Sequence, residues 1–385
     1  SPPSQPSISS LPPASSSTKL PPPAATAPPK KPSLFSRAKK PKKDKSNKPK
    51  PEKDMGFSDI AGQDQLIRIM TSPDLTLVKA VLGMCEIREK DRMAMCLVHL
   101  FELNGTTPHL VKTLIEQEIQ ETQPGTSAAA SLFRGNSVAT KILTAYSLIT
   151  GTEYLKKTLK PLLSSVVYSS GGFEIDPNRL GPADSVKDNV QNLLAVVTMF
   201  TSKIMRSVDA VPFHLRKVLA HLSAVIRLKF PDAEVAVLGS FFFLRFICPT
   251  IISPLESGIW TDKIPPHSAR CLVLISKTLQ NLANGVLFGQ KEPFMEPLNP
   301  FIQEHIPQVK TFYEGLTSNI DEDTTAIAAA SGSVLKRDPE VFAHLHEVLA
   351  ERLDIIRTHV ERNHFSNLEK VELLESFLRD QQLIS

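Results

Sequence analysis

Two arginines are the candidate functional residues of this sequence, because neither has an obvious charged partner nearby in the chain. Arg134 lies in a tight loop, in which Gly135 and Asn136 tolerate backbone shapes that other residues resist. Asn136 or Ser137 can cap the helix that follows. Arg134 is therefore expected in an exposed loop directly before a helix.

Arg245 lies in an almost entirely apolar run from Ala233 to Cys248. This run predicts a helix buried on every side, too short to span a bilayer and stopped by Pro249. A buried guanidinium costs several kcal/mol, roughly, unless its donors find acceptors. Polar groups are therefore expected against this helix, and a purely structural arginine that ties down loop carbonyls is an equally open interpretation.

Sequence motifs for several common active sites are missing. The chain has no phosphate-binding loop and no dinucleotide fingerprint, and its ten histidines are scattered singly. No Ser-His-Asp or Cys-His arrangement can be argued from spacing. We therefore expect no self-contained active site, no metal site and no cofactor.

The first 56 residues differ in composition from the rest of the chain. They hold 14 prolines and 12 Lys and Arg against 3 Asp and Glu, whereas residues 57–385 hold 32 against 37. Such a segment cannot bury enough apolar surface to order itself, so residues 1–56 are predicted to be a disordered Pro/Ser/Lys-rich basic tail. A solvated linker is the simpler interpretation, and proline-recognising domains or an anionic membrane surface are alternative partners. The acidic balance of the remainder argues against nucleic-acid binding.

The four cysteines have apolar neighbours and form no C-x-x-C pair, which favours core residues in a reducing compartment. No signal peptide or transmembrane run is visible. A cytoplasmic location is expected, with a peripheral position at the inner face of the plasma membrane as an alternative.

From Phe57 onward the apolar spacing is helical, and no strand pattern appears. The helix after Ser137 is expected to end at Gly151, and one helix is expected over about 338–361. A capping box at Ser366–Glu369 predicts another, near 366–381. The remaining helices are expected near 72–86, 90–104, 107–121, 185–207, 212–230 and 268–287.

The helix over 268–287 carries a polar row opposite its apolar face, formed by Lys277, Asn281 and Asn284. Such a row is more often a solvated face than a binding surface. Lys291 follows in the next loop.

These segments resemble the three signature blocks of the Ras GTPase-activating protein family, in the family's order and spacing. The resemblance covers about residues 57–382. The first block is Leu132-Phe133-Arg134-Gly135-Asn136-Ser137 with Ala139 and Lys141, the second is Phe243–Pro249, and the third is Ser276-Lys277, Gln280–Asn284, Phe288–Glu292 and Asn299–Ile302.

The resemblance implies an all-α domain over 57–385, with a central catalytic part over about 107–315. An extra part would be formed by the two ends, about 57–106 and 316–385. It also implies a partner, a Ras-type small GTPase in its GTP-bound form, whose nucleotide and magnesium would complete a composite site.

Residue roles come from the same resemblance. Arg134 would be the arginine finger that enters the GTPase active site, and Arg245 would brace the finger loop by bonding its backbone. The residues that would contact the GTPase are Leu132, Phe133, Gly135, Asn136, Leu244, Lys277, Asn281 and Lys291.

Two alternatives stay open. Relatives that lose the finger act as binding scaffolds without catalysis, and Arg134 speaks against that function here. The sequence does not separate Ras from Rap as the GTPase.

Overall fold

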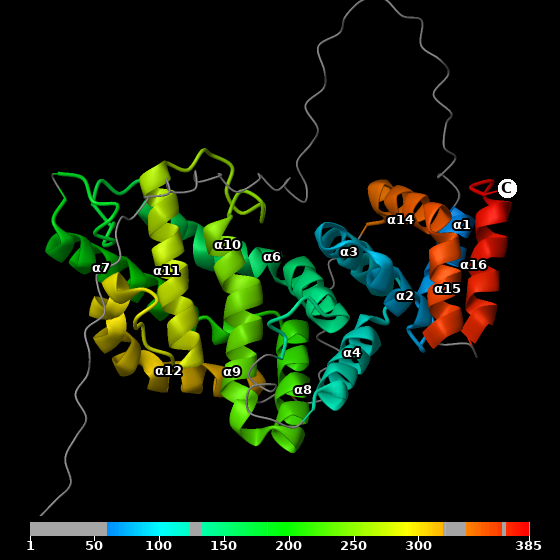
Figure 1. The fold of residues 1–385 in the computed structure, drawn as a ribbon, viewed down its shortest axis with the longest axis horizontal. Coiled ribbons are helices and arrows are strands. Elements are labelled where there is room, and N and C mark those ends of the chain that lie inside the picture. The colour runs from blue at the N-terminus through cyan, green and yellow to red at the C-terminus, as the bar shows by residue number, and fades with distance from the viewer. Residues whose placement is uncertain are drawn as a thin grey trace, which may run out of the picture. The chain divides into compact units, whose positions relative to one another are not determined.

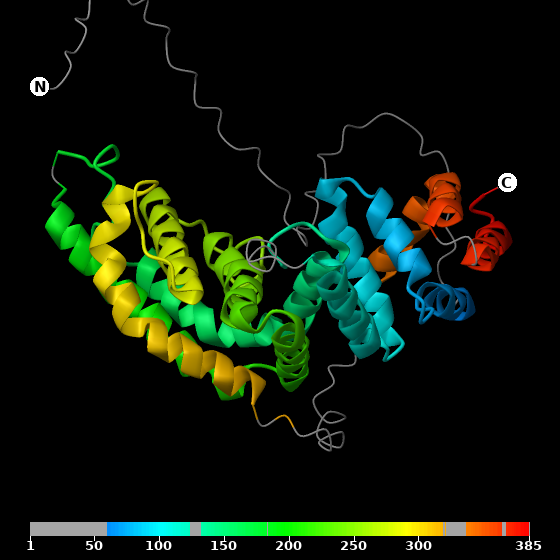
Figure 2. The same cartoon turned by 60° about the horizontal axis from the view of Figure 1, so that its bottom comes forward.

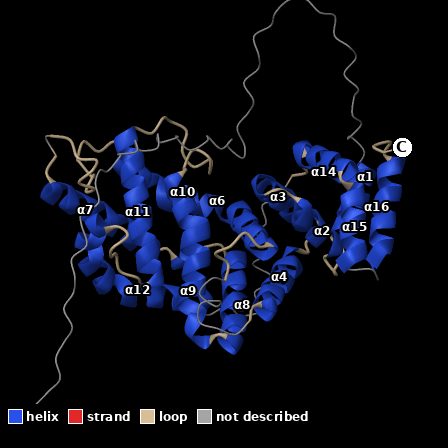
Figure 3. Cartoon of the chain, viewed as in Figure 1, coloured by secondary structure: helices blue, strands red, loops and turns tan. Residues whose placement is uncertain are grey.

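Helices form the regular secondary structure of this computed structural model, which describes residues 60–123, 132–182, 184–318, 320, 336–363 and 367–384. These residues contain no strand (Figure 3). The predicted all-α fold is confirmed. The tail predicted over 1–56 lies outside the described residues.

The helices nearest the two chain ends pack together (Figure 1). The α15 helix contacts α2, α16 contacts α1, and α14 contacts α3. An extra part built from both ends was expected, although its boundaries near 106 and 316 stay a prediction. The six helices are α1 (Ile60–Met70), α2 (Thr76–Met84), α3 (Ile87–Leu103), α14 (Pro339–Glu351), α15 (Leu353–Asn363) and α16 (Leu368–Asp380).

The helices between them hold the candidate site. The α6 helix links the two groups, because it packs against α3 as well as α4 and α7 (Figure 2). The α-helices here, together with the π-helical segment η3, are α4 (Thr107–Glu121), α6 (Val138–Val167), α7 (Val186–Met205), α8 (Phe213–Lys229), α9 (Glu234–Gly239), η3 (Ser240–Ile247), α10 (Cys248–Ile252), α11 (Pro266–Asn284) and α12 (Asn299–Thr317).

The apolar helix that contains Arg245 is longer than expected. Helical structure continues from Pro231 through Ile252, past Pro249, which occupies the first turn of α10. Pro249 lies where the wider π-helical turns of η3 pass into α10, an irregularity in the helical hydrogen-bond pattern at which a proline can be accommodated. This stretch of 22 residues is long and apolar enough to cross a membrane, but 67% of its most apolar window is buried in the protein, as in a core helix.

Aromatic side chains bury this helix. Phe242 contacts Phe246 with ring centroids 5.6 Å apart and Phe312 of α12 at 5.4 Å, both edge to face. Tyr154 of α6 stacks on Phe246 at 6.0 Å. Each buried aromatic side chain stabilises the fold by roughly 1.5–3 kcal/mol, so this cluster fixes the helix between α6 and α12.

The prediction that Gly151 ends its helix was wrong, because α6 continues to Val167. A Cβ atom at Gly151 would lie 2.4 Å from Cζ of Phe246. The glycine is required by this close approach and not by a helix end.

The C-terminal helices also differ from expectation. The helix predicted over 338–361 is two helices, separated at Arg352. The α11 helix ends at Asn284, because Gly285 adopts φ 64°, and Val286 is exposed beyond it. The α12 helix was not predicted, and Ser366 of the proposed capping box lies outside the described residues.

Candidate functional site

The loop that carries Arg134 connects α4 to α6, and we call residues 132–137 the Arg134 loop. Ser137 caps α6, since its Oγ accepts a hydrogen bond from the amide of Thr140 at 3.1 Å. The side chains of Arg134 and Asn136 are exposed, as is Gly135. The expected exposed loop before a capped helix is therefore present.

Leu132 and Phe133 do not lie where their expected role would place them. Their side chains are buried, with 4% and 0% of their surface exposed. They anchor the loop in the core and are unavailable as side-chain contacts to a partner. Any contact they make must use the backbone.

Arg245 holds the backbone of the Arg134 loop. Its Nε donates to the carbonyl of Phe133 at 3.2 Å, and its Nη2 donates to the carbonyls of Arg134 and Gly135, the latter at 2.7 Å. The guanidinium is half-buried, less than the sequence suggested. Burial lowers its pKa, while the charges of Asp91 and Glu118 act in the opposite direction. The acceptors required by an arginine in an apolar helix are these loop carbonyls.

The side chain of Arg134 lies along the surface formed by η3 and α11. Its Nε donates to Oγ of Ser240 at 2.8 Å, and its Nη2 donates to Oδ1 of Asn284 at 3.1 Å. Neither acceptor carries a formal charge. The cation is thus held by two neutral contacts that a stronger anionic ligand could replace.

The segment η3 is π-helical, with wider turns than an α-helix. Short π-helical turns occur frequently at functional sites. Ser240 at its start contacts the Arg134 side chain, and Arg245 five residues later contacts the loop backbone. One irregular helical segment therefore contacts both the side chain of Arg134 and the backbone of its loop.

The polar row on α11 is not a uniform solvated face. Lys277 forms an ion pair with Glu292, which lies in the loop beyond α11. Asn284 contacts Arg134, whereas Asn281 and Leu244 are half-buried and Lys291 is exposed. Lys291 is therefore the more available cation of the two lysines expected to contact a partner.

Metal-ligating side chains do not cluster in the described part of the chain: no three His, Cys, Asp or Glu residues gather as a metal site requires. The chemistry offered by these residues is that of cationic hydrogen-bond donors. Such donors stabilise developing negative charge when they are fixed in place beforehand.

The family model described as "GTPase-activator protein for Ras-like GTPase" matches residues 110–182 and 181–284, which include the Arg134 loop, η3 and α11. The chain belongs to the Ras GTPase-activating protein family. The fold is accordingly a Ras-GAP helical domain.

Curated relatives agree with this assignment. The probable Ras GTPase-activating-like protein ngap of Dictyostelium discoideum is 32% identical over 310 residues, covering 77% of this chain and 34% of the relative. Human Ras GTPase-activating protein 1 is 31% identical over 295 residues, covering 75% and 27%. Ras GTPase-activating protein gap-2 of Caenorhabditis elegans is 30% identical, covering 67% and 21%. The chain thus spans about a third or less of each relative's length.

Three contacts of this Ras-GAP domain were missed by the sequence reasoning. Ser240 lies 106 residues from Arg134, and Glu118 hydrogen bonds to the Arg134 loop from α4. Glu292 pairs with Lys277. Nothing in the type or spacing of these serine and glutamate residues indicates which residue they contact. Glu292 lies within the third motif block, but its pairing with Lys277 was not expected.

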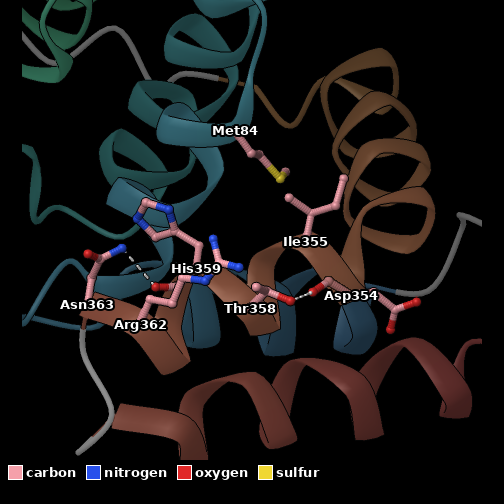
Figure 4. A pocket seen from close by; sticks show the side chains of 7 residues that line it. All are labelled: Met84, Asp354, Ile355, Thr358, His359, Arg362 and Asn363. Carbon is pink, nitrogen blue, oxygen red and sulfur yellow. Dashed lines mark hydrogen bonds between the residues drawn. The ribbon is translucent and has the colours of Figure 1, made fainter.

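A pocket of about 380 Å³ lies away from these elements, between the end of α2 and α15 (Figure 4). Met84 points toward Ile355 there, and His359 and Arg362 line the same hollow. None of its lining residues belongs to the candidate site. The site is a surface built around a loop, and this pocket is separate from it.

Proposed function

We propose that this chain accelerates GTP hydrolysis by a Ras-type small GTPase in its GTP-bound form. Arg134 acts as the arginine finger of a composite site, and the GTPase contributes the nucleotide and its magnesium ion. The observation that carries the proposal is the exposed Arg134 on a loop whose carbonyls are bonded by Arg245. The chain covers only 34%, 27% and 21% of these relatives, so the activity of the whole protein is part of the proposal.

The chemistry assigned to Arg134 is electrostatic. Its guanidinium would leave Ser240 and Asn284 and contact phosphate oxygens on which charge increases in the transition state. A cation placed in a site without water stabilises such charge strongly. Arg245 keeps the loop ordered before the partner arrives, so less entropy is lost when the complex forms.

The surface around the loop would bind the GTPase. Three of the residues expected to contact the GTPase are exposed: Gly135, Asn136 and Lys291. Two others, Leu244 and Asn281, are half-buried. Lys277 would have to exchange Glu292 for an acidic group on the partner. We extend the proposal to a cytoplasmic location, with residues 1–56 serving proline-recognising domains or an anionic membrane.

The test is single-turnover GTP hydrolysis by purified Ras and Rap, with wild type, Arg134→Ala and Arg179→Ala. Arg179 is an exposed arginine in a different loop and serves as the matched control. Wild type and Arg179→Ala should stimulate one GTPase, and Arg134→Ala should lose about 10³-fold or more of that stimulation. This magnitude is the general range for arginine fingers that act on Ras-type GTPases, the standard example of this chemistry.

The same experiment separates the alternatives. Binding to a GTP-bound GTPase without stimulation by wild type would make the protein a non-catalytic scaffold. Full stimulation by Arg134→Ala would refute the finger. The responding GTPase decides between Ras and Rap.

A further inference from the structure

The carboxylate of Glu118 contacts both ends of the segment Phe133–Ser137. The amide of Phe133 donates to Oε1 of Glu118 at 3.3 Å, and the hydroxyl of Ser137 donates to Oε2. Ser137 is also the N-cap of α6. One side chain from α4 therefore joins the beginning of the Arg134 loop to the first turn of the helix after it.

Phe133 has a backbone conformation that needs such support. Its φ is 55°, in the left-handed region, which is unfavourable for a bulky residue. The ring is fully buried, Glu118 accepts from the amide, and Arg245 donates to the carbonyl. The strained residue directly before Arg134 is thus held from three sides.

We propose that Glu118 is a positioning residue for the finger: it fixes both ends of the loop and thereby sets the direction in which Arg134 leaves the surface. This inference rests on the proposed function. Glu118 and Arg245 divide the task, because Glu118 holds the amide of Phe133 and the helix cap, whereas Arg245 holds the carbonyls of Phe133, Arg134 and Gly135.

Glu118 is suited to this task because its own backbone is fixed. Lys229 of α8 donates to the carbonyls of Ile119 and Gln120 at 2.9 and 2.8 Å. The carbonyl of Glu118 itself accepts from the amide and hydroxyl of Thr122. The last turn of α4 is therefore tied to α8, and its side chains are held on a rigid element.

The energetics agree with a dedicated role. Burial raises the pKa of Glu118 above its ordinary value, so its charge is unfavourable there, while the hydrogen bonds from Ser137 and Phe133 act in the opposite direction. The charge of Arg245 also favours the ionised carboxylate. Glu118 is half-buried, and its hydrogen bonds with the loop offset the free-energy cost of keeping a carboxylate there.

The experiment compares wild type with Glu118→Ala, Glu118→Gln and the control Glu121→Ala. Glu121 is exposed and lies one turn later on α4. Each variant is measured for kcat and KM of the stimulated hydrolysis, for thermal unfolding and for amide hydrogen exchange across residues 132–137.

Glu118→Ala should lower kcat about 10- to 100-fold, because it removes two hydrogen bonds to a charged group that position the loop. KM should be nearly unchanged, because Glu118 is not among the residues proposed to bind the GTPase. Glu118→Gln should recover most of kcat, because its oxygen still accepts from Phe133 and its amide can donate to Ser137. Loop amides should exchange faster in Glu118→Ala alone. Equal kcat in all folded variants would overturn the inference.

Hydrogen exchange makes the outcome independent of the GTPase. In wild type the amide of Phe133 should exchange more slowly than that of Asn136, which bonds to no residue that the structure describes. Equal rapid exchange of both amides overturns the positioning role even if an Ala variant fails to fold. Absent stimulation by wild type with Phe133 protected would instead refute the proposed function.

Discussion

Arg245 and Arg352 show how two regions of this molecule use the same side chain differently. Arg352, at the break between α14 and α15, makes two hydrogen bonds of 2.9 Å to the carboxylate of Glu89 on α3. Arg245 makes its bonds to carbonyls of the Arg134 loop. The first arginine joins helices near the two chain ends, and the second shapes a loop.

The two arginines leave different charge balances behind in their regions. An ion pair between helices contributes to stability and leaves no charge uncompensated. An arginine bonded to carbonyls keeps its charge near Arg134, and the charges of Asp91 and Glu118 partly compensate it. Substitutions at the chain ends should therefore affect stability, and substitutions around the loop should affect activity.

The largest contrast is expected from the pair Arg245→Lys and Arg352→Lys. The ammonium of lysine lacks the planar fork of donors with which Arg245 spans the carbonyls of Phe133, Arg134 and Gly135, so Arg245→Lys should lower stimulated GTP hydrolysis about 10- to 100-fold. Arg352→Lys should leave hydrolysis unchanged and lower the free energy of unfolding by about 1 kcal/mol or less. Denaturant unfolding and single-turnover assays of both variants check this. Equal losses of activity in the two variants would contradict the expectation that only the region around the loop affects hydrolysis.

A smaller effect is expected from acid on the Glu89–Arg352 pair. The hydrogen bonds from Arg352 lower the pKa of Glu89 from 4.5 to about 2. Its contribution to stability is therefore present above about pH 4.5 and is lost as the pH falls toward 2. Because Glu89 is one-third exposed, Glu89→Gln should lose only about 0.5–1 kcal/mol at neutral pH.

The measurement is urea unfolding of wild type and Glu89→Gln between pH 2 and pH 7. The difference between the two proteins should shrink toward zero at the acid end, as long as both remain folded there. A difference independent of pH would show that the charge of Glu89 is not what stabilises the chain ends.

Ser240→Ala should produce a modest effect in the region of the loop. It removes one neutral contact that holds the Arg134 side chain on the surface. Release of the Arg134 side chain then costs less, and on the proposed function kcat/KM should rise about two- to fivefold, within the range of one neutral hydrogen bond. A matched Ser223→Ala change, at a buried serine of α8, should not raise it; a loss of activity in Ser240→Ala would mean that the docked position is the productive one.

Removal of residues 1–56 should have the smallest effect. Solution stimulation by the protein lacking this tail should equal that of the full chain, because the candidate site uses α4, α6, η3 and α11. Assays with anionic vesicles carrying the GTPase should reveal any contribution of the basic residues. A large drop in solution without vesicles would contradict the linker interpretation of the tail.

Residue types and spacing predict the helical class and the exposed loop around Arg134, whereas the roles of the site residues were expected only from the resemblance to the family. Apolar spacing identifies most of the helices, and Gly135, Asn136 and Ser137 predict a loop that ends in a capped helix. The cost of placing Arg245 in an apolar run requires acceptors, and the loop carbonyls are those acceptors. The need for acceptors follows from local residues, whereas the carbonyl of Phe133 lies 112 residues away and was expected only from the resemblance to the family.

Other helix boundaries and the partners of the site residues depend on tertiary packing, because these contacts join residues far apart in the chain. A glycine is required at position 151 inside α6 because a Cβ atom there would collide with the ring of Phe246, 95 positions later, and the helix that Pro249 was expected to end continues past it. Ser240 holds Arg134 across 106 residues. Glu118 reaches the strained Phe133 only because α4 and η3 approach the loop from two sides, and sequence spacing cannot reveal a partner that packing selects.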